Sequence, residues 1–528
     1  MLISGKYHFS KSEPYSALLT AFNNFCDDLL LKDQATILNC QAQILNAVGQ
    51  EGGLLTSVIR NLNLIIGQQP NISDAFGQGD AFGQGSKTAK NRFHYVFVKL
   101  IKAICSVGFP IVLALEDLQW MDLESLSLLS TLVKDKSIKN FMLVGSYRDN
   151  EVISTDPVNV LLDDIKHSDQ TLTFIKLNNF NHEILNELIF DALCIPSHEA
   201  YTLTAFIYEK TNGNPFFANQ MIRTLSEQGS IFYSNDIGKW KWDEGVFGDK
   251  DISRNVLELF RSKILTLDEF TQEAIKAASC LGSSFSLQTL KLIVNRTDSI
   301  ECALSSGLIA RQNGSEGVYR FAHHQMQQAA FTLLPEDPRR IMLYIGKKLW
   351  SLYSQEELNE NIFVVIHLLH YAENLITDHD ERSKVAELFL QAGNKAITLT
   401  AFNQAFEYLQ AGIEMAGEKC WESDYDLSLK LYDAAAKSAY CISNFDSLEN
   451  YIKAILKNAA NALDTVQTYS LQIRYYNDNR KFQDGFDTAV CILNKIGENT
   501  NFTQSEVEID AEIQMSKCIL ISCNKCIS

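Results

Sequence analysis

The sequence has no long apolar run and no excess of basic residues. No stretch of about 18 apolar residues occurs, so we expect no membrane-spanning helix. The N-terminus also lacks the basic and then apolar segments of a signal peptide. With 64 acidic against 46 basic side chains the net charge is −18, which argues against a generic binder of nucleic acid or of anionic membranes.

Proline and glycine are also scarce. Only 8 Pro and 26 Gly occur in 528 residues, which argues against disordered and fibrous classes. A chain of this length, 46% hydrophobic, is long enough for about three to five domains, each with its own core. Apart from one close pair near the C-terminus, Cys523 and Cys526, which we interpret as part of a tail rather than a zinc half-site, the 12 cysteines are scattered. This indicates free thiols in a reducing, cytosolic compartment.

A strand–helix–strand pattern occupies the middle of the first 150 residues. Apolar residues fall on one face of a predicted helix over 93–104. The apolar run 111–115 has no alternation, which predicts a central parallel strand covered on both faces. Asp122 is placed to cap the next helix, and the run 141–147 predicts the strand that follows. Residues 2–7 are a candidate for a further strand of the same sheet.

The region after about residue 340 contains a repeat. A pattern of small residues around Phe402 recurs around Phe445 and, more weakly, around Phe482, at offsets of 43 and 37 residues. Small residues let paired helices approach each other, and an aromatic side chain wedges the turn between them. The pattern therefore predicts a helical solenoid of the tetratricopeptide kind, with a plain helical bundle as the alternative.

Two carboxylates, Glu116 and Asp117, stand directly at the end of the predicted central strand. A strand end at the carboxyl edge of a parallel sheet opens into the ligand crevice. The first carboxylate of such a pair can hold Mg²⁺, and the second can polarise an attacking water. This is the chemistry of a Walker B motif. On spacing alone, a solvated acidic turn or a helix cap is the alternative.

The residues around this acid pair resemble a known family. The segment from Ile111 to Asp122, which reads IVLALEDLQWMD, resembles the predicted-ATPase branch of the STAND class of AAA-like ATPases. Further segments agree in the same order, namely SEPYSA from Ser12, LVGSYRDNEV from Leu143, TNGNPFF from Thr211, YRFAHH from Tyr319 and QQAA from Gln327. In such proteins this module is often joined to protein-kinase or histidine-kinase parts, as in hybrid signal-transduction histidine kinases.

The resemblance implies an α/β fold followed by helical modules. The α/β part is an incomplete AAA-like parallel sheet with helices, and a winged-helix domain and an all-α TPR-like solenoid follow it. The implied boundaries are 1–155 for the partial ATPase core with a flexible loop at 71–91, 156–250 for a helical lid, 251–340 for the winged-helix-like domain, and 341–528 for the repeats, the last of which is incomplete.

The resemblance also implies roles for individual residues. Glu116 takes the Mg²⁺-associated position and Asp117 the catalytic-acid position, so that both lie at the metal. Arg148 senses the γ-phosphate of ATP. The alternative for Arg148 is a surface ion pair with Asp149 or Glu151, which contributes little.

The lid motif supplies the other expected nucleotide contacts. Gly213, Asn214 and Pro215 are implied to bind the nucleotide, with Pro215 packed near the adenine. A plain helix start at Pro215 with Asn214 as its cap is the alternative. ATP and Mg²⁺ are the cofactors expected for the family. The pair His323 and His324 is interpreted as a structural cap on the winged-helix segment.

The phosphate-binding loop is the main departure from the family. A P-loop reads Gly-x4-Gly-Lys-Ser/Thr, because its backbone N–H groups wrap the phosphates. The near match from Gly83 to Thr88 has Ser86 where glycine is required, follows no predicted strand and lies inside a duplicated segment, so we interpret it as coincidental. The family's loop precedes the segment that matches Ile3–Tyr7. The sequence therefore predicts a piece of a longer protein, with weak or absent ATP binding.

Together these features predict a regulatory ATPase-type segment of a signal-transduction protein. We expect it to respond to nucleotide in its full-length context and to be unable to hydrolyse ATP as this chain. The alternative is a non-enzymatic, TPR-like protein-interaction scaffold with a relic ATPase sheet. The expected partners are a protein bound by the repeats and kinase domains in cis. Nucleic acid is not expected, because residues 253–335 carry eight Arg and Lys against seven Asp and Glu.

Overall fold

The computed structural model describes residues 1–7, 13–69, 86–108, 110–153, 156–168, 170–195, 197–236, 238–243, 256–294, 299–312 and 317–497. The chain divides into two compact units. The first unit consists of residues 1–78 and 91–392, and the second of residues 79–90 and 393–528. No helix of the described residues is long and apolar enough to cross a membrane.

The first part of the chain forms a three-stranded sheet with its helices. In chain order its elements are β1 (Leu2–Lys6), α1 (Ser16–Leu30), α2 (Gln34–Val48), η1 (Gly49–Glu51), α3 (Gly52–Thr56), η2 (Arg60–Leu62), α4 (Asn63–Ile66), α7 (Ser86–Ser106), β2 (Ile111–Glu116), η3 (Leu118–Trp120), α8 (Leu123–Lys134), β3 (Phe141–Gly145), η4 (Asp149–Glu151) and α9 (Pro157–His167).

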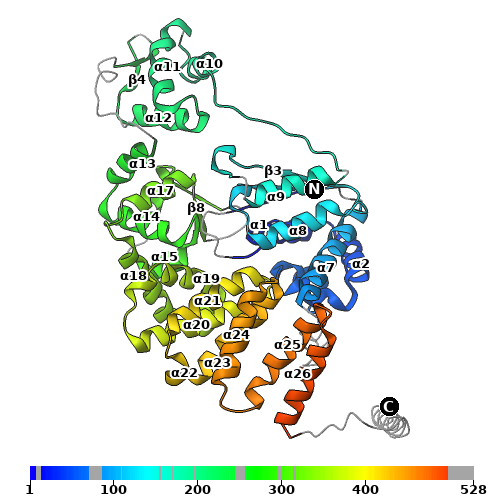
Figure 1. The fold of residues 1–528 in the computed structure, drawn as a ribbon. Helices are drawn as coiled ribbons and strands as arrows, with labels where there is room; N and C mark the ends of the chain where they lie inside the picture. Colours follow the sequence, from blue (N-terminus) through cyan, green and yellow to red (C-terminus); the bar gives the residue numbers. More distant parts are fainter. Residues whose placement is uncertain are drawn as a thin grey trace. The chain divides into compact units, whose positions relative to one another are not determined.

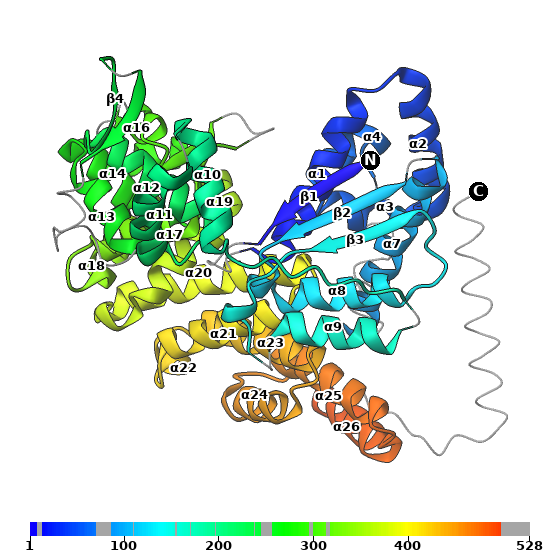
Figure 2. The ribbon, with the colours of Figure 1, turned by 90° about the horizontal axis from the view of Figure 1, so that it is seen from above.

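Strand β2 is the central strand of this sheet. The strand order is β1-β2-β3 and both pairings are parallel, and Figure 2 shows the three strands side by side. The side chains of Ile111, Leu113 and Leu115 lie on one face of β2 and are buried. The central parallel strand predicted from the sequence is therefore confirmed, and so are the flanking strands predicted within 2–7 and 141–147.

The opposite face of the sheet is open in the described part of the chain. Leu2, Val112 and Met142 lie in one row of the strand register. Leu2 is 65% and Met142 is 59% exposed, and Val112 is only half-buried. Val144, two residues along β3, is 42% exposed. The prediction that the central strand is covered on both faces is therefore wrong for the described residues, because only one face of the sheet is buried.

Helices α7 and α8 form as the apolar pattern predicts. The face of α7 that carries Phe93 and Phe97 is buried, and the ring of Phe97 packs edge-on against Phe22 of α1 at a centroid distance of 4.9 Å. Helix α7 begins at Ser86, inside the predicted 71–91 loop. The duplicated segment itself lies outside the described residues.

Asp122 caps α8 by accepting a hydrogen bond from the backbone N–H of Ser125 at 2.8 Å, as predicted.

Helix α9 packs against α8, which precedes it in the chain. Lys134 and Asp164 add an ion pair of 2.8 Å between the two helices. The next helix, α10, begins at His182.

Two small modules follow in the first unit. The first consists of α10 (His182–Leu193), α11 (Ser197–Thr211), α12 (Pro215–Glu227), β4 (Ile231–Ser234) and β5 (Lys239–Trp242). The second consists of α13 (Val256–Leu265), α14 (Glu269–Leu281), β6 (Ser284–Ser286), α15 (Leu287–Ile293), α16 (Ser299–Ser305), β7 (Ile309–Arg311), β8 (Val318–Phe321) and α17 (His324–Thr332). We call these the lid module and the β6–β8 module. The latter has an antiparallel sheet of order β6-β8-β7.

The rest of the described chain is helical. Its elements are α18 (Pro338–Leu352), α19 (Gln355–Tyr371), η6 (Glu373–Leu375), α20 (His379–Thr398), α21 (Phe402–Ala416), α22 (Cys420–Ser423), α23 (Tyr425–Cys441), α24 (Phe445–Asn458), η7 (Leu463–Thr465), α25 (Val466–Asp478) and α26 (Phe482–Lys495). Figure 1 shows these helices in yellow to red. The first unit ends within α20.

The predicted repeat appears as one turn geometry used three times. Each turn that precedes a repeat phenylalanine places a residue in the left-handed region two positions earlier, namely Thr400 (φ 58°), Ser443 (φ 61°) and Arg480 (φ 60°). Small residues permit close helix approach within the second unit, since a Cβ on Gly393 would lie 2.5 Å from Leu409. The prediction of repeated helix pairs is therefore confirmed for the described residues.

The two faces of the sheet predict different responses to truncation. Leu113 is fully buried on β2, so we expect Leu113→Ala to lower the free energy of unfolding by about 2–5 kcal/mol. Val144→Ala, on the open face, is expected to cost less than about 1 kcal/mol. Urea unfolding followed by circular dichroism measures both. Equal losses would mean that the open face is covered in solution.

Candidate functional site

Charged side chains from three strands gather at the carboxyl edge of the sheet. Lys6 ends β1, Glu116 and Asp117 end β2, and Arg148 follows β3 by three residues. Parallel strands present their carboxyl ends at the same edge, which is where α/β sheets bind ligands. Hydrogen bonds continue the ladder past the strand ends, because Ser146 N–H donates to the carbonyl of Leu115 at 2.9 Å. The backbone at this edge of the sheet is therefore held in place by hydrogen bonds.

Lys6 makes the shortest contact to the acid pair. Its Nζ lies 2.8 Å from Oδ2 of Asp117 and 3.6 Å from Oε2 of Glu116. Lys6 and Glu116 are register partners in the β1–β2 pairing, so the contact follows directly from strand alignment. The side chain of Asp117 is 12% exposed, whereas that of Glu116 is 57% exposed. Asp117 is therefore the more buried member of the pair.

Arg148 approaches the other oxygen of the same carboxylate. Its Nη2 lies 3.7 Å from Oδ1 of Asp117, and its Nη1 donates to Oε1 of Glu151 at 2.7 Å. Gln119 joins these groups, because its amide donates to Asp117 at 3.3 Å and to Glu151 at 3.2 Å. The ion pair with Glu151, which is the plainer alternative for Arg148, is thus present together with the approach to Asp117.

Asp117 has an uncommon backbone and a perturbed carboxyl. Its φ of 55° and ψ of 49° lie in the left-handed region, which non-glycine residues adopt rarely and which recurs at functional sites. Burial acts to raise the pKa of Asp117, but the hydrogen bond and charge of Lys6, with the charge of Arg148, outweigh it and hold the pKa below its ordinary value. The carboxylate is ionised at neutral pH.

Two histidines of the β6–β8 module reach this edge within the first unit. Nη1 of Arg148 lies 2.8 Å from Nε2 of His324, and the imidazole ring lies 5.6 Å from the Trp120 ring, centroid to centroid. His323 caps α17 through its Nδ1, which accepts from Gln325 N–H at 3.2 Å, so the predicted capping role is confirmed for this residue. His324 contacts Arg148, the residue that the sequence predicts to sense phosphate.

Both imidazoles are neutral at pH 7. Burial and then the charge of neighbouring groups, with Arg148 among them, lower the pKa of His323 to about 3 and that of His324 to about 4. A neutral His324 accepts the Arg148 hydrogen bond at Nε2, so its proton is on Nδ1. That buried nitrogen has no hydrogen-bond partner among the described residues.

The lid motif is built as a helix start. Asn214 is the N-cap of α12, and its side chain accepts from the backbone N–H groups of Phe216 and Phe217 at 3.1 and 3.2 Å. Pro215 is the first residue of the helix. The geometry is therefore that of a plain helix start with Asn214 as its cap, which was the alternative to nucleotide binding. Gly213 has φ 71°, and a Cβ there would lie 2.0 Å from the carbonyl oxygen of Phe180. Only glycine fits that position.

The lid motif and the acid pair are connected through the histidines. The ring of Phe216 stacks on His323 at a centroid distance of 4.4 Å and an interplanar angle of 20°. His323 is adjacent to His324, which contacts Arg148. The structure therefore brings Glu116, Asp117 and Arg148 together directly. It connects Gly213, Asn214 and Pro215 to them only through neighbouring aromatic rings.

The acid pair as it stands does not fit a magnesium ion. Mg²⁺ requires near-octahedral oxygen ligation, and usually keeps several waters beside one or two carboxylates. Both oxygens of Asp117 already face donors, Oδ2 the Lys6 ammonium and Oδ1 the amide of Gln119 and the guanidinium of Arg148. No group of three or more His, Cys, Asp or Glu suited to a metal occurs among the described residues.

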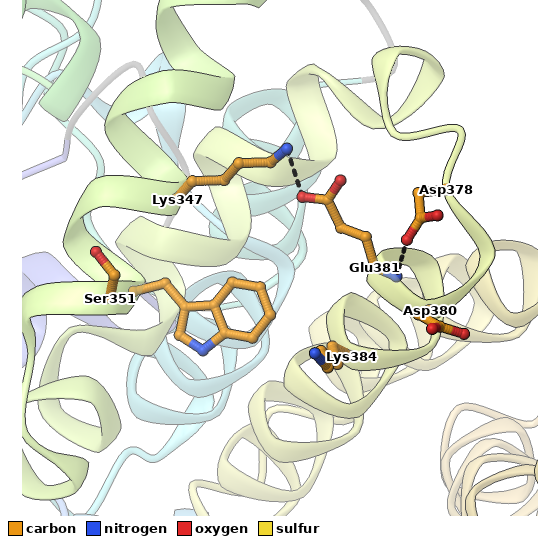
Figure 3. Close-up of a pocket in the computed structure, with 7 residues that line it drawn as sticks. Lys347, Ser351, Asp378, Asp380, Glu381 and Lys384 are labelled. Carbon is orange, nitrogen blue, oxygen red and sulfur yellow. Dashed lines mark hydrogen bonds and ion pairs between the residues drawn. The ribbon is translucent and has the colours of Figure 1, made fainter.

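A separate groove lies between α18 and the start of α20, with a volume of about 580 Å³ (Figure 3). An ion pair between Lys347 and Glu381 links its two walls, and Asp378 caps the start of α20 by accepting from Glu381 N–H at 2.9 Å. Trp350 and Lys384 also line it. Its charges are mixed and partly paired within the groove, so they favour no single charge class of ligand.

Sequence reasoning placed the acids and Arg148 but missed Lys6, Gln119 and His324 as members of the site. Lys6 and Glu116 end two strands that the sequence itself predicts, so aligning those strand ends was a usable signal for Lys6. No such signal exists for His324. It lies 176 residues from Arg148 along the chain, and only the packing of two modules brings them together.

A comparison with known families finds a match at the parallel sheet. Residues 3–144 match the family described as "AAA ATPase domain". This match confirms, for these residues, the class of module predicted from the sequence. It takes in the acid pair, all of β2 and all but one residue each of β1 and β3.

Two curated histidine kinases are similar to nearly the whole chain. Hybrid signal transduction histidine kinase G of Dictyostelium discoideum is 21% identical over 623 residues, covering 94% of this chain and 18% of that protein. Peroxide stress-activated histidine kinase mak3 of Schizosaccharomyces pombe is 20% identical over 507 residues, covering 86% of this chain and 21% of that protein. The chain thus spans about a fifth of the length of these relatives.

One solved structure with a detectable likeness is a STAND protein with a tetratricopeptide repeat sensor from Pyrococcus horikoshii. The sequence identity is 14% and the TM-score is 0.39, over 85% of this chain and 64% of that one.

The neutral histidines predict an acid-sensitive first unit. Below its ordinary pKa of about 6.5 a histidine is protonated in the unfolded chain, whereas folded His324 stays neutral until about pH 4. The unfolded state then binds more protons, so the free energy of unfolding falls as the pH drops from 7 to 5. We expect His324→Gln to reduce that fall by about 2 kcal/mol, measured by urea unfolding at both pH values.

The matched control for this experiment is His379→Gln, because the side chain of His379 is 65% exposed. It is expected to leave the pH dependence as in the wild type. An equal fall in His324→Gln and in the wild type would contradict the neutral, buried state of His324.

Proposed function

We propose that this chain is the regulatory ATPase-type segment of a signal-transduction protein of the histidine-kinase kind. In the full-length protein it responds to nucleotide, and as this chain it does not hydrolyse ATP. The β6–β8 module, which we propose to be winged-helix-like, reports the state of the sheet edge to the helical repeats. Those repeats bind a protein partner, with kinase domains in cis as the receiving parts. We expect it to act in the cytoplasm.

One observation carries this proposal, which is the shared guanidinium of Arg148. One side of it faces Asp117 at the sheet edge, and the other contacts His324 at 2.8 Å. A group bound at the edge of the sheet would compete with His324 for Arg148, because Arg148 contacts Asp117 and His324 with one rigid, planar guanidinium. The buried Nδ1 of His324 has no hydrogen-bond partner in the described part of the chain, so this contact is held at a cost and can be exchanged.

The lack of hydrolysis follows from the state of the acid pair. A carboxylate that activates an attacking water accepts a hydrogen bond from it through a free lone pair, and donors already placed at both oxygens compete for that position. Here Lys6 and Gln119 contact the two oxygens of Asp117 at 2.8 and 3.3 Å. The match to Gly-x4-Gly-Lys-Ser/Thr at Gly83–Thr88 is also incomplete. Its last three residues, Ser86–Thr88, begin helix α7.

A non-enzymatic scaffold remains the second candidate, because the repeats use one turn geometry three times and form a surface of their own. The two candidates differ in nucleotide dependence. Binding of the kinase part of the same polypeptide to this chain, measured by calorimetry, would be unaffected by ATP if the chain is only a scaffold.

We expect ATP turnover by this chain to stay below about 10⁻⁴ s⁻¹, under the intrinsic rate of an unassisted GTPase, and calorimetry to detect weak or no ATP binding. Asp117→Asn should leave this background unchanged. A rate that falls in Asp117→Asn would show that the acid pair is catalytic. If a form of this chain extended upstream, without kinase domains, also fails to bind ATP, nucleotide responsiveness is lost from the proposal.

The Arg148–His324 contact predicts a local change in α17. Arg148→Ala removes a hydrogen bond from a charged donor, worth about 1 kcal/mol, so amide hydrogen exchange in the first turns of α17 should quicken about fivefold. Arg311→Ala is the matched control, because the exposed Arg311 pairs with Glu301 at 3.3 Å in the same module. Unchanged exchange in Arg148→Ala, or an equal rise in the control, would overturn this role.

A further inference from the structure

Lys6 is held at the acid pair by the backbone on both sides of it. Ile3 and Tyr7 are buried, and Tyr7 N–H donates to the carbonyl of Glu116 at 3.0 Å, which closes the ladder beyond Lys6. A Cβ on Gly5 would lie 1.9 Å from the carbonyl oxygen of Ala17, so α1 rests directly on β1. The strand therefore cannot slide along β2, and the Lys6 side chain starts beside the two carboxylates.

Both carboxylates of the acid pair have a cation nearby, although Arg148 also pairs with Glu151 at 2.7 Å. The Lys6 ammonium lies 2.8 Å from Asp117 and 3.6 Å from Glu116, so a single cation bridges both acids. Arg148 adds a second positive charge 3.7 Å from the other oxygen of Asp117. A divalent ion brought to Asp117 would meet two fixed cations at contact range, and like charges at such distances repel strongly in a partly buried site.

We propose that Lys6 is the resident cation of the Glu116–Asp117 pair. Its ammonium takes the place beside Asp117 that a divalent ion takes in metal-dependent sites, so the pair binds no divalent ion while Lys6 is present. This proposal does not depend on the proposed function. It is argued from the contacts of Lys6 with Asp117 and Glu116, and it makes Lys6 a residue that positions the two carboxylates.

The test is divalent-ion binding in the absence of nucleotide, with Mn²⁺ as the probe and electron paramagnetic resonance as the readout. Lys6→Met keeps most of the length of the side chain and removes its charge. We expect Lys6→Met to bind Mn²⁺ at least about tenfold more tightly than the wild-type chain, because the acids lose their counter-charge. The double variant Lys6→Met with Asp117→Asn should lose that gain.

Two controls isolate the effect. Lys6→Arg keeps a cation at the pair and should bind Mn²⁺ as the wild type does. Lys176→Met removes a lysine from an exposed pair with Asp149, which has a contact of 2.9 Å, and should not create a site. Wild-type binding equal to that of Lys6→Met and lost in Asp117→Asn would overturn the proposal, as would a folded Lys6→Met without any gain.

A second measurement on the wild-type chain covers the case in which Lys6→Met does not fold. Reductive methylation followed by mass spectrometry should modify Lys6 more slowly than Lys176, whose side chain is 73% exposed. Added Mg²⁺ should leave the Lys6 rate unchanged. A Lys6 rate that rises with Mg²⁺ would mean that the ion displaces the ammonium, against the proposal. Failure of ATP binding elsewhere would affect only the proposed function, since no nucleotide is present here.

Discussion

The parallel register of β1 and β2 is the constraint on which the rest of the site depends. It sets Lys6 opposite Glu116 and therefore beside Asp117, and it makes all three strands end at one edge. Because only one face of the strands is buried, a slip of one residue would turn that buried face outward. The packing of the buried face fixes the strand register, and the register in turn fixes the geometry of the ion pairs at the edge.

The same edge links parts of the chain that are distant in sequence. Arg148 connects Asp117 to His324, and the neighbouring His323 stacks on Phe216 of the lid module. Among the described residues, the buried Nδ1 of His324 has no hydrogen-bond partner. A junction built from several modest contacts around one cation can rearrange at little cost, which suits a regulatory element more than a rigid active site.

The sequence predicted the local structure well where one physical signal dominated. Apolar runs predicted β1, β2 and β3, Asp122 and Asn214 were recognisable as caps, and the phenylalanine spacing predicted the repeated helix turns. It failed where burial depended on distant elements. The open face at Met142 and Val144 could not be foreseen, because an apolar strand looks the same whether one face or both are covered.

By itself the sequence determined the class of module, the acid pair at a strand end and the incomplete match to a phosphate-binding loop at 83–88, since these depend on residue types at fixed spacing. Tertiary structure alone decided what those acids face. Lys6 is 110 residues from Glu116 along the chain, and His324 is 176 from Arg148. Strand register brings the first pair together and module packing the second. Which charges neutralise each other depends on distances in space, and these distances cannot be read from the spacing of residues along the chain.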